Sequence, residues 1–175
     1  MSNQIWIVSD PHFGHHNLNR HRESLGAPDR PDEALADHWA DNVHKRDVVW
    51  ILGDVGMGKP AYETLAKLPG IKRLILGNHD NAKWALNVGK VRSLHGSLER
   101  NGILFTHFPV ATEFVRPRYR CNVHGHTHEH KMPDSDVHHC MCPEFMGWQV
   151  HSLESVVQSA IYFSPPWEVP DGSEA

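Results

Sequence analysis

Short apolar runs alternate with amphipathic segments along this chain of 175 residues. Apolar runs of about five residues bounded by Gly or Asp are typical of strands covered on both faces. The pattern predicts strands at 4–8, 48–52, 71–76, 91–95, 102–106, 137–142 and 147–151.

The amphipathic segments predict helices near 31–44, 60–67, 81–87 and 152–163, and the segment from His12 to Arg22 is predicted to be a loop. In the first helix, apolar positions recur every four residues and acidic positions are expected to face water. The apolar positions are Leu35, Trp39 and Val43, and the acidic ones are Asp32, Glu33, Asp37 and Asp41. Alternating strands and helices predict a layered α/β fold.

Length and charge limit the classes of protein. We expect one domain over 1–163, burying on the order of 70% of its unfolded surface, and a Pro-rich tail over 164–175. A net charge of −4 leaves nucleic acid as a conceivable but not favoured partner. Neither a signal-peptide pattern nor a run of 18 apolar residues is present. We therefore expect a cytoplasmic protein without membrane association, whose oligomeric state the sequence leaves open.

Side chains that bind metal ions follow four of the apolar runs and recur in one further block. They are Asp10, His12, Asp54, Asn78, His107, His126 and His128. Imidazole nitrogens combined with carboxylate and amide oxygens suit Mn, Fe, Zn, Co and Ni. Because ligands bind at the carboxyl ends of strands in open α/β sheets, the pattern predicts a site for two metal ions.

Two of the blocks place ligands two residues apart. Asp10 and His12 form one pair, and His126 and His128 form the other. In an extended backbone both members of a pair point to the same face, so each pair is expected to serve one cluster.

Each block also has an ordinary interpretation. A single Asp-x-His arises by chance, and Gly53-Asp54 is a common turn. The segment 77–80 could be a turn followed by a helix N-cap. The joint occurrence of all the blocks in one order at strand ends favours the metal site.

The order Asp-x-His, Gly-Asp, Gly-Asn-His-Asp, His and Gly-His-x-His spans roughly residues 5 to 128. It resembles the calcineurin-like metallophosphoesterase superfamily. The segments 9–17, 52–55 and 107–109 are similar to its small single-domain bacterial and phage members. The resemblance implies a four-layer α/β sandwich of two mixed β-sheets flanked by helices.

The resemblance also implies a binuclear centre with two divalent transition-metal ions, of which Mn is favoured while Fe, Zn, Ni and Co remain open. Asp54 would bridge the ions, and a hydroxide shared by both would attack phosphorus. By resemblance the first ion is held by Asp10, His12 and His128, and the second by Asn78, His107 and His126.

Other residues take roles from the same resemblance. His79 is the candidate general acid, and Asp80 is a candidate to orient a nearby ring. Several relatives carry an orienting aspartate where this chain has Met57. His15, Asn17 and Arg22 are the candidate substrate contacts, with arginine able to bind a phosphoryl group through two donors.

These features predict a phosphodiesterase that hydrolyses a small nucleotide or cyclic nucleotide. The segment after Asp54 lacks the Asp-Arg-Gly typical of protein phosphatases in this superfamily. A nuclease acting on strand ends would need an aromatic and basic platform, and a phosphomonoesterase is a further alternative. A catalytically silent scaffold of the same fold is disfavoured because His79 is present.

Overall fold

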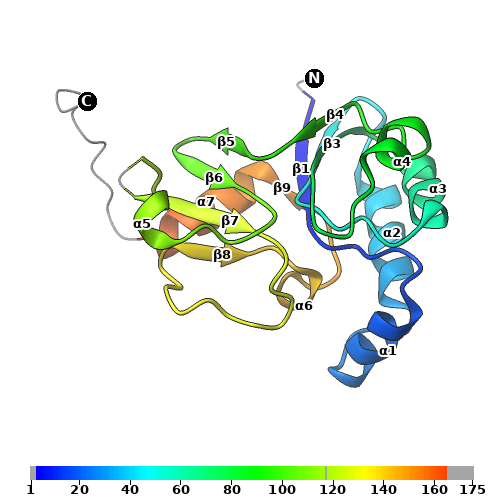
Figure 1. Cartoon of the computed structure of the whole chain (residues 1–175), viewed down its shortest axis with the longest axis horizontal. Coiled ribbons are helices and arrows are strands. Elements are labelled where there is room, and N and C mark those ends of the chain that lie inside the picture. Colours follow the sequence, from blue (N-terminus) through cyan, green and yellow to red (C-terminus); the bar gives the residue numbers. More distant parts are fainter. Residues whose placement is uncertain (1–2, 117, 165–175) are drawn as a thin grey trace.

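Two mixed β-sheets form the centre of the molecule (Figure 1). The computed structural model describes residues 3–116 and 118–164. One sheet has the strand order β4-β3-β2-β1-β9 and the other has β5-β6-β7-β8. The strands are β1 (Ile5–Val8), β2 (Val48–Ile51), β3 (Ile71–Ile75), β4 (Ser93–His95), β5 (Leu98–Arg100), β6 (Ile103–Phe105), β7 (Cys121–His124), β8 (His138–Cys140) and β9 (His151–Ser152).

Helices flank the sheets, and this arrangement confirms the predicted fold class. Figure 1 shows α2, α3 and α4 together beside the first sheet, with α5 at the opposite end of the molecule. The helices are α1 (His16–Ser24), α2 (Pro31–Asn42), α3 (Lys59–Lys67), α4 (Ala82–Asn87), α5 (Thr112–Val115), α6 (Pro143–Met146) and α7 (Leu153–Phe163).

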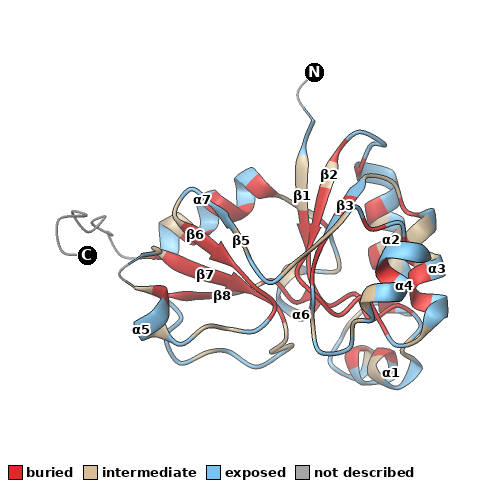
Figure 2. Ribbon diagram, turned by 45° about the horizontal axis from the view of Figure 1, so that its top comes forward, coloured by how far each residue is buried: buried red, intermediate tan, exposed pale blue. Residues whose placement is uncertain are grey.

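Two apolar cores lie on the two faces of the first sheet. Trp39 of α2 and Tyr62 of α3 pack with Ile51 of β2 on one face. On the other face, Trp50 of β2 packs with Phe105 of β6, and α7 closes this second core. Figure 2 shows the buried strands meeting between the helices. Each central strand is therefore covered on both faces, as its apolar run predicts.

The segment predicted as a loop contains a helix instead, α1. The mostly polar helix gives no apolar period that could identify it. His15 caps it, with the ring Nδ1 accepting a hydrogen bond from the Leu18 amide at 3.2 Å. Histidine is not among the residues that usually mark a helix start.

The prediction for α2 holds for its apolar side and fails at one acidic residue. Leu35, Trp39 and Val43 are buried as expected. Asp32 is also buried, because its carboxylate accepts hydrogen bonds from the Gly14 amide at 2.8 Å and the Asn19 side chain at 2.7 Å. This residue ties α2 to the turn before α1 and does not face water.

The remaining differences concern short elements. The strand predicted at 137–142 is limited to β8, which ends at Cys140, and α6 begins at Pro143. Helices α5 and α6 have one turn each, which is too short for a periodic signal. The predicted tail lies outside the described residues from 165 onward. Among the described helices, none combines the length and apolar character needed to span a membrane.

The register of the strands brings their carboxyl ends to one place. Val8 of β1 pairs with Ile51 of β2, which pairs with Leu74 of β3, all in parallel. In the second sheet, Phe105 of β6 pairs in parallel with Val123 of β7. The five segments that follow these strands therefore meet, and they are the segments that carry the predicted ligands.

Candidate metal centre

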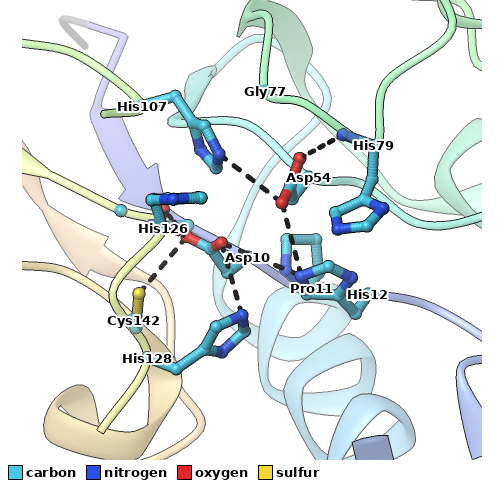
Figure 3. Close-up of polar contacts among 12 residues, drawn as sticks. Asp10, Pro11, His12, Asp54, Gly77, His79, His107, His126, His128 and Cys142 are labelled. Carbon is cyan, nitrogen blue, oxygen red and sulfur yellow. Dashed lines mark hydrogen bonds and ion pairs between the residues drawn. The ribbon is translucent and has the colours of Figure 1, made fainter. Parts of the chain in front are cut away.

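The predicted ligands form two groups where the five segments meet (Figure 3). One group joins Asp10 and His12 after β1 with His128 after β7; the other joins Asp54 after β2 with His107 after β6 and His126 after β7. In each group the atoms that could bind a metal lie within 4.8 Å of one another. The groups match the division that the resemblance implies, with Asp54 counted in the second. They separate His126 from His128, so the expectation that this pair serves one cluster is wrong.

Asp54 lies between the two groups. Its Oδ2 is 3.6 Å from His12 Nε2 and 3.5 Å from His107 Nε2. Its Oδ1 accepts a hydrogen bond from the His79 amide at 2.9 Å. A single oxygen of the Asp54 carboxylate therefore faces both groups, while the other oxygen fixes the backbone at His79 through a hydrogen bond.

The two carboxylate oxygens of Asp10 also differ in their contacts. Oδ2 accepts hydrogen bonds from the Ser9 hydroxyl, the Cys142 thiol and the His126 amide. Oδ1 and the facing His12 Nε2 are buried without a hydrogen-bond partner among the described residues. Since leaving buried polar atoms unpaired costs about 1–3 kcal/mol each, these two atoms fit a divalent cation placed between them.

The second group has matching chemistry. His107 Nδ1 lies 2.8 Å from the Leu52 carbonyl oxygen. Because a carbonyl can only accept, this nitrogen carries the proton and Nε2 presents its lone pair. The Asn78 side-chain oxygen is 3.1 Å from that Nε2, which places Asn78 beside the second group as predicted.

The electrostatics of the first group favour the binding of a cation. Burial raises the pKa of Asp10 above its usual value, although His107 and the Ser9 hydroxyl act against this. Burial and the positive charge of Arg22 lower the pKa of His12 to about 2. His12 is therefore neutral near pH 7, as a metal ligand must be, and Asp10 would be stabilised as a carboxylate by a bound cation.

The backbone at the ligands is left-handed. Asp10, His12, Asp54, His126 and His128 have φ values of 50°, 48°, 55°, 69° and 48°. The extended backbone predicted for the two pairs of ligands is therefore wrong. Left-handed residues other than glycine cost of order 1–3 kcal/mol each and gather at functional sites.

Two glycines allow the ligand segments to approach closely. A side chain at Gly77 would overlap the Asp54 carboxylate, and one at Gly125 would overlap Ser9 Oγ and Asp10 Oδ2. Glycine therefore precedes Asn78 and His126 because there is no space for a Cβ atom.

Comparison with known proteins identifies the family. The sequence pattern of the calcineurin-like phosphoesterase superfamily domain matches residues 4–147. The chain belongs to this superfamily. It is similar to the Gene 66 proteins of Mycobacterium phages D29 and L5, with 35% and 31% identity. These matches cover 73% and 79% of this chain, and 79% and 83% of the phage proteins.

A solved structure supports the fold. The protein of unknown function AQ665 from Aquifex aeolicus superposes with a TM-score of 0.71 and 21% identity, over 90% of this chain and all of that protein. At this identity the likeness concerns the fold alone. Members of the superfamily typically bind two metal ions, in agreement with the two groups.

The candidate acid His79 lies at the edge of this calcineurin-like site. Its exposed ring is 5.4 Å from the His12 ring, centroid to centroid. No hydrogen bond within the described ranges orients this ring, and Met57, at the position of the relatives' aspartate, has an exposed side chain. The backbone of His79 is fixed by the hydrogen bond from its amide to Asp54 Oδ1.

Asp80 does not orient an imidazole, which corrects its predicted role. Its carboxylate accepts hydrogen bonds from the amides of Asp54, Val55 and Gly77 and from the Tyr62 hydroxyl, at 2.8–3.0 Å. Asp80 therefore fixes the segments after β2 and β3 against each other. It supports the site through the backbone.

Arg22 is not placed to bind substrate, which is a second correction. Its guanidinium is buried, with the whole residue only 1% exposed. It pairs with Glu144 at 2.8 Å and donates to the Asp10 carbonyl at 2.9 Å. Glu144, in α6, also contacts His128, and no motif in the sequence marks it.

The other two predicted substrate contacts differ in position. His15 lies beside the first group, with its ring 5.9 Å from the His12 ring. Asn17 is exposed on α1, where its oxygen accepts a hydrogen bond from Arg20 at 2.6 Å. No contact found in the described part of the chain brings Asn17 to the ligand groups.

The central position of Asp54 predicts the effect of Asp54→Asn. Removing its charge should weaken binding of both ions, by at least the roughly 10–100-fold that loss of a supporting partner costs at metal sites. Calorimetric titration of the metal-free protein with Mn²⁺ measures both affinities. Asp37→Asn, an exposed change of the same kind on α2, is the control, and selective loss of one ion would contradict the bridging position.

Proposed function

We propose that this chain is a binuclear metal-dependent phosphodiesterase that hydrolyses a small nucleotide or cyclic nucleotide. The observation that most directly supports this proposal is the position of Asp54 Oδ2, which lies within 3.6 Å of imidazoles from both ligand groups. Together with membership of the calcineurin-like superfamily, this favours two ions that act on one phosphate ester.

The bound ions would supply a water of lowered pKa and stabilise charge on the phosphoryl oxygens. The chain would supply the proton for the leaving oxygen from the ring of His79, which is exposed beside His12. His15, next to the same ring, offers a further donor to the phosphoryl group because its Nδ1 is already occupied by the Leu18 amide.

An exposed aromatic ring beside the ligands supports a nucleotide substrate. The Phe108 ring lies 4.5 Å from the His126 ring and 4.8 Å from the His107 ring, and the residue is 47% exposed. Nucleobases stack on such rings with about 1–3 kcal/mol per base. Phe108 is therefore the proposed contact for the base.

Two arginines between α5 and β7, which could contact a nucleic-acid backbone, are engaged by other parts of the chain. Arg120 donates to the carbonyls of Ile161 and Ser164 at the end of α7, at 3.0 and 3.1 Å. Arg116 lies 3.7 Å from the Asp136 carboxylate. This engagement favours a small substrate over a nucleic-acid strand.

The first test is hydrolysis by metal-stripped protein with Mn, Ni, Co, Zn or Mg added back singly. Bis-(p-nitrophenyl) phosphate is compared with p-nitrophenyl phosphate. We expect turnover that depends on a transition metal and favours the diester. Preference for the monoester would indicate a phosphatase instead, and no turnover with two ions bound would indicate a silent scaffold.

The position of His79 predicts the effect of His79→Ala. Both ions should remain bound while the diesterase rate falls by about 10²–10⁴-fold, the typical contribution of a general acid. Metal content and kcat are measured on the same samples. His130→Ala, which removes an 83% exposed imidazole near His128, is the control; loss of metal in His79→Ala would show a ligand role instead.

The stacking surface predicts a selective effect of Phe108→Ala. The kcat/KM for cyclic nucleotides should fall about tenfold, within the energy range of one stacked base, while an aliphatic phosphodiester should be cleaved as before. Phe114→Ala, which removes a 74% exposed ring on α5, should change neither value. Equal losses on both substrates would argue against base stacking.

A further inference from the structure

A buried ion pair connects two helices to the first ligand group. Glu144 Oε1, in α6, accepts hydrogen bonds from Arg22 Nε in α1 at 2.8 Å and from His128 Nδ1 at 2.9 Å. The side chains of Arg22 and Glu144 are 0% and 7% exposed. The described side-chain partner of His128 Nδ1 is therefore Glu144, which is not one of the predicted ligands. Glu144, His128 and Cys142 also form a further cluster of side chains able to bind a metal ion.

Arg22 makes further contacts to the same ligand group. Its two terminal nitrogens donate to the carbonyl oxygens of Asp10 and Pro11, at 2.9 and 3.4 Å. The Trp148 ring covers the guanidinium, with its centroid 5.1 Å from the central carbon. The segment carrying Asp10 and His12 is thus tied to the same ion pair that holds His128.

We propose that the Arg22–Glu144 pair positions the first metal-binding group. Since a carboxylate can only accept, Glu144 keeps the His128 proton on Nδ1 and directs the Nε2 lone pair toward Asp10 Oδ1, 4.0 Å away. A carboxylate behind a ligand imidazole also makes it a better electron donor. The inference rests on the proposed function, because it assumes that this group holds an ion.

The second group does not share this dependence. His107 is oriented by the Leu52 carbonyl at 2.8 Å, which belongs to the backbone after β2. Loss of the ion pair should therefore affect one ion and spare the other. A role in packing alone would give no such difference between the two sites.

Titration of the metal-free full-length protein with Mn²⁺ tests the proposal. In Glu144→Ala we expect one of the two binding sites to weaken about 10–100-fold, as loss of an outer partner of a ligand does, while the other keeps its affinity. Glu144→Gln keeps an acceptor oxygen and should recover part of the loss. Glu129→Gln is the matched control, because Glu129 follows His128 directly and its carboxylate pairs with exposed His21 instead.

A second variant separates positioning from loss of folding. Removing one member of a buried ion pair leaves an uncompensated charge, whereas apolar replacement of both members is often neutral for stability. Arg22→Met combined with Glu144→Leu should therefore stay folded, checked by circular dichroism, and still bind the first ion about 10–100-fold more weakly.

The outcomes distinguish this inference from the proposed function. Two ions bound by every variant with wild-type affinity would overturn the inference alone. Equal weakening at both sites would overturn it too, because that pattern indicates general damage. Fewer than two ions bound by the unaltered protein would count against the binuclear function itself, and with it against the inference.

Discussion

The side chains of Asp10 and Asp54 are buried at the point where both sheets end, and the surrounding segments are organised around them. A buried carboxylate is unfavourable unless hydrogen bonds and positive charge compensate it. Each gives one oxygen to backbone amides or small donors and leaves the other facing imidazoles. In each carboxylate, one oxygen is satisfied by hydrogen bonds from the protein. The other oxygen faces the imidazoles and marks the position where a cation would fit.

This arrangement explains features that would otherwise be unfavourable. Five ligands have left-handed backbone, and Gly77 and Gly125 lack the space for any side chain. Such conformations persist only where the surrounding contacts impose them. The paired parallel strands fix the positions of the segments that follow them. Asp80 adds two hydrogen bonds to the segment after β2, one to Gly77 within its own segment and one to Tyr62 of α3. The fold thus holds the candidate ligands in place through contacts within the protein.

The strands and the location of the candidate site could be predicted because they depend on local patterns, whereas the division of the ligands into two groups came from the resemblance to the superfamily. Apolar runs ending at Asp10, Asp54 and His107 gave the strands and the site together. Helix α1 could not be predicted in this way, since its residues are polar and its cap is a histidine. Arg22 and Asp80 were misassigned because a charged residue near a motif looks the same whether it faces substrate or backbone. Only tertiary contacts distinguish the two.

Glu144 illustrates the same limit at longer range. It lies 16 residues after His128 and 122 after Arg22 in sequence, within a one-turn helix that has no periodic signal. Its carboxylate remains charged because the His128 hydrogen bond and the Arg22 charge outweigh its burial and lower the pKa of Glu144 to about 2. A buried ion pair of this kind is seldom needed for stability, since apolar residues of similar volume would often stabilise the fold equally well. The position of Glu144 next to the imidazole of His128 is better explained by an effect on that candidate ligand than by a contribution to stability.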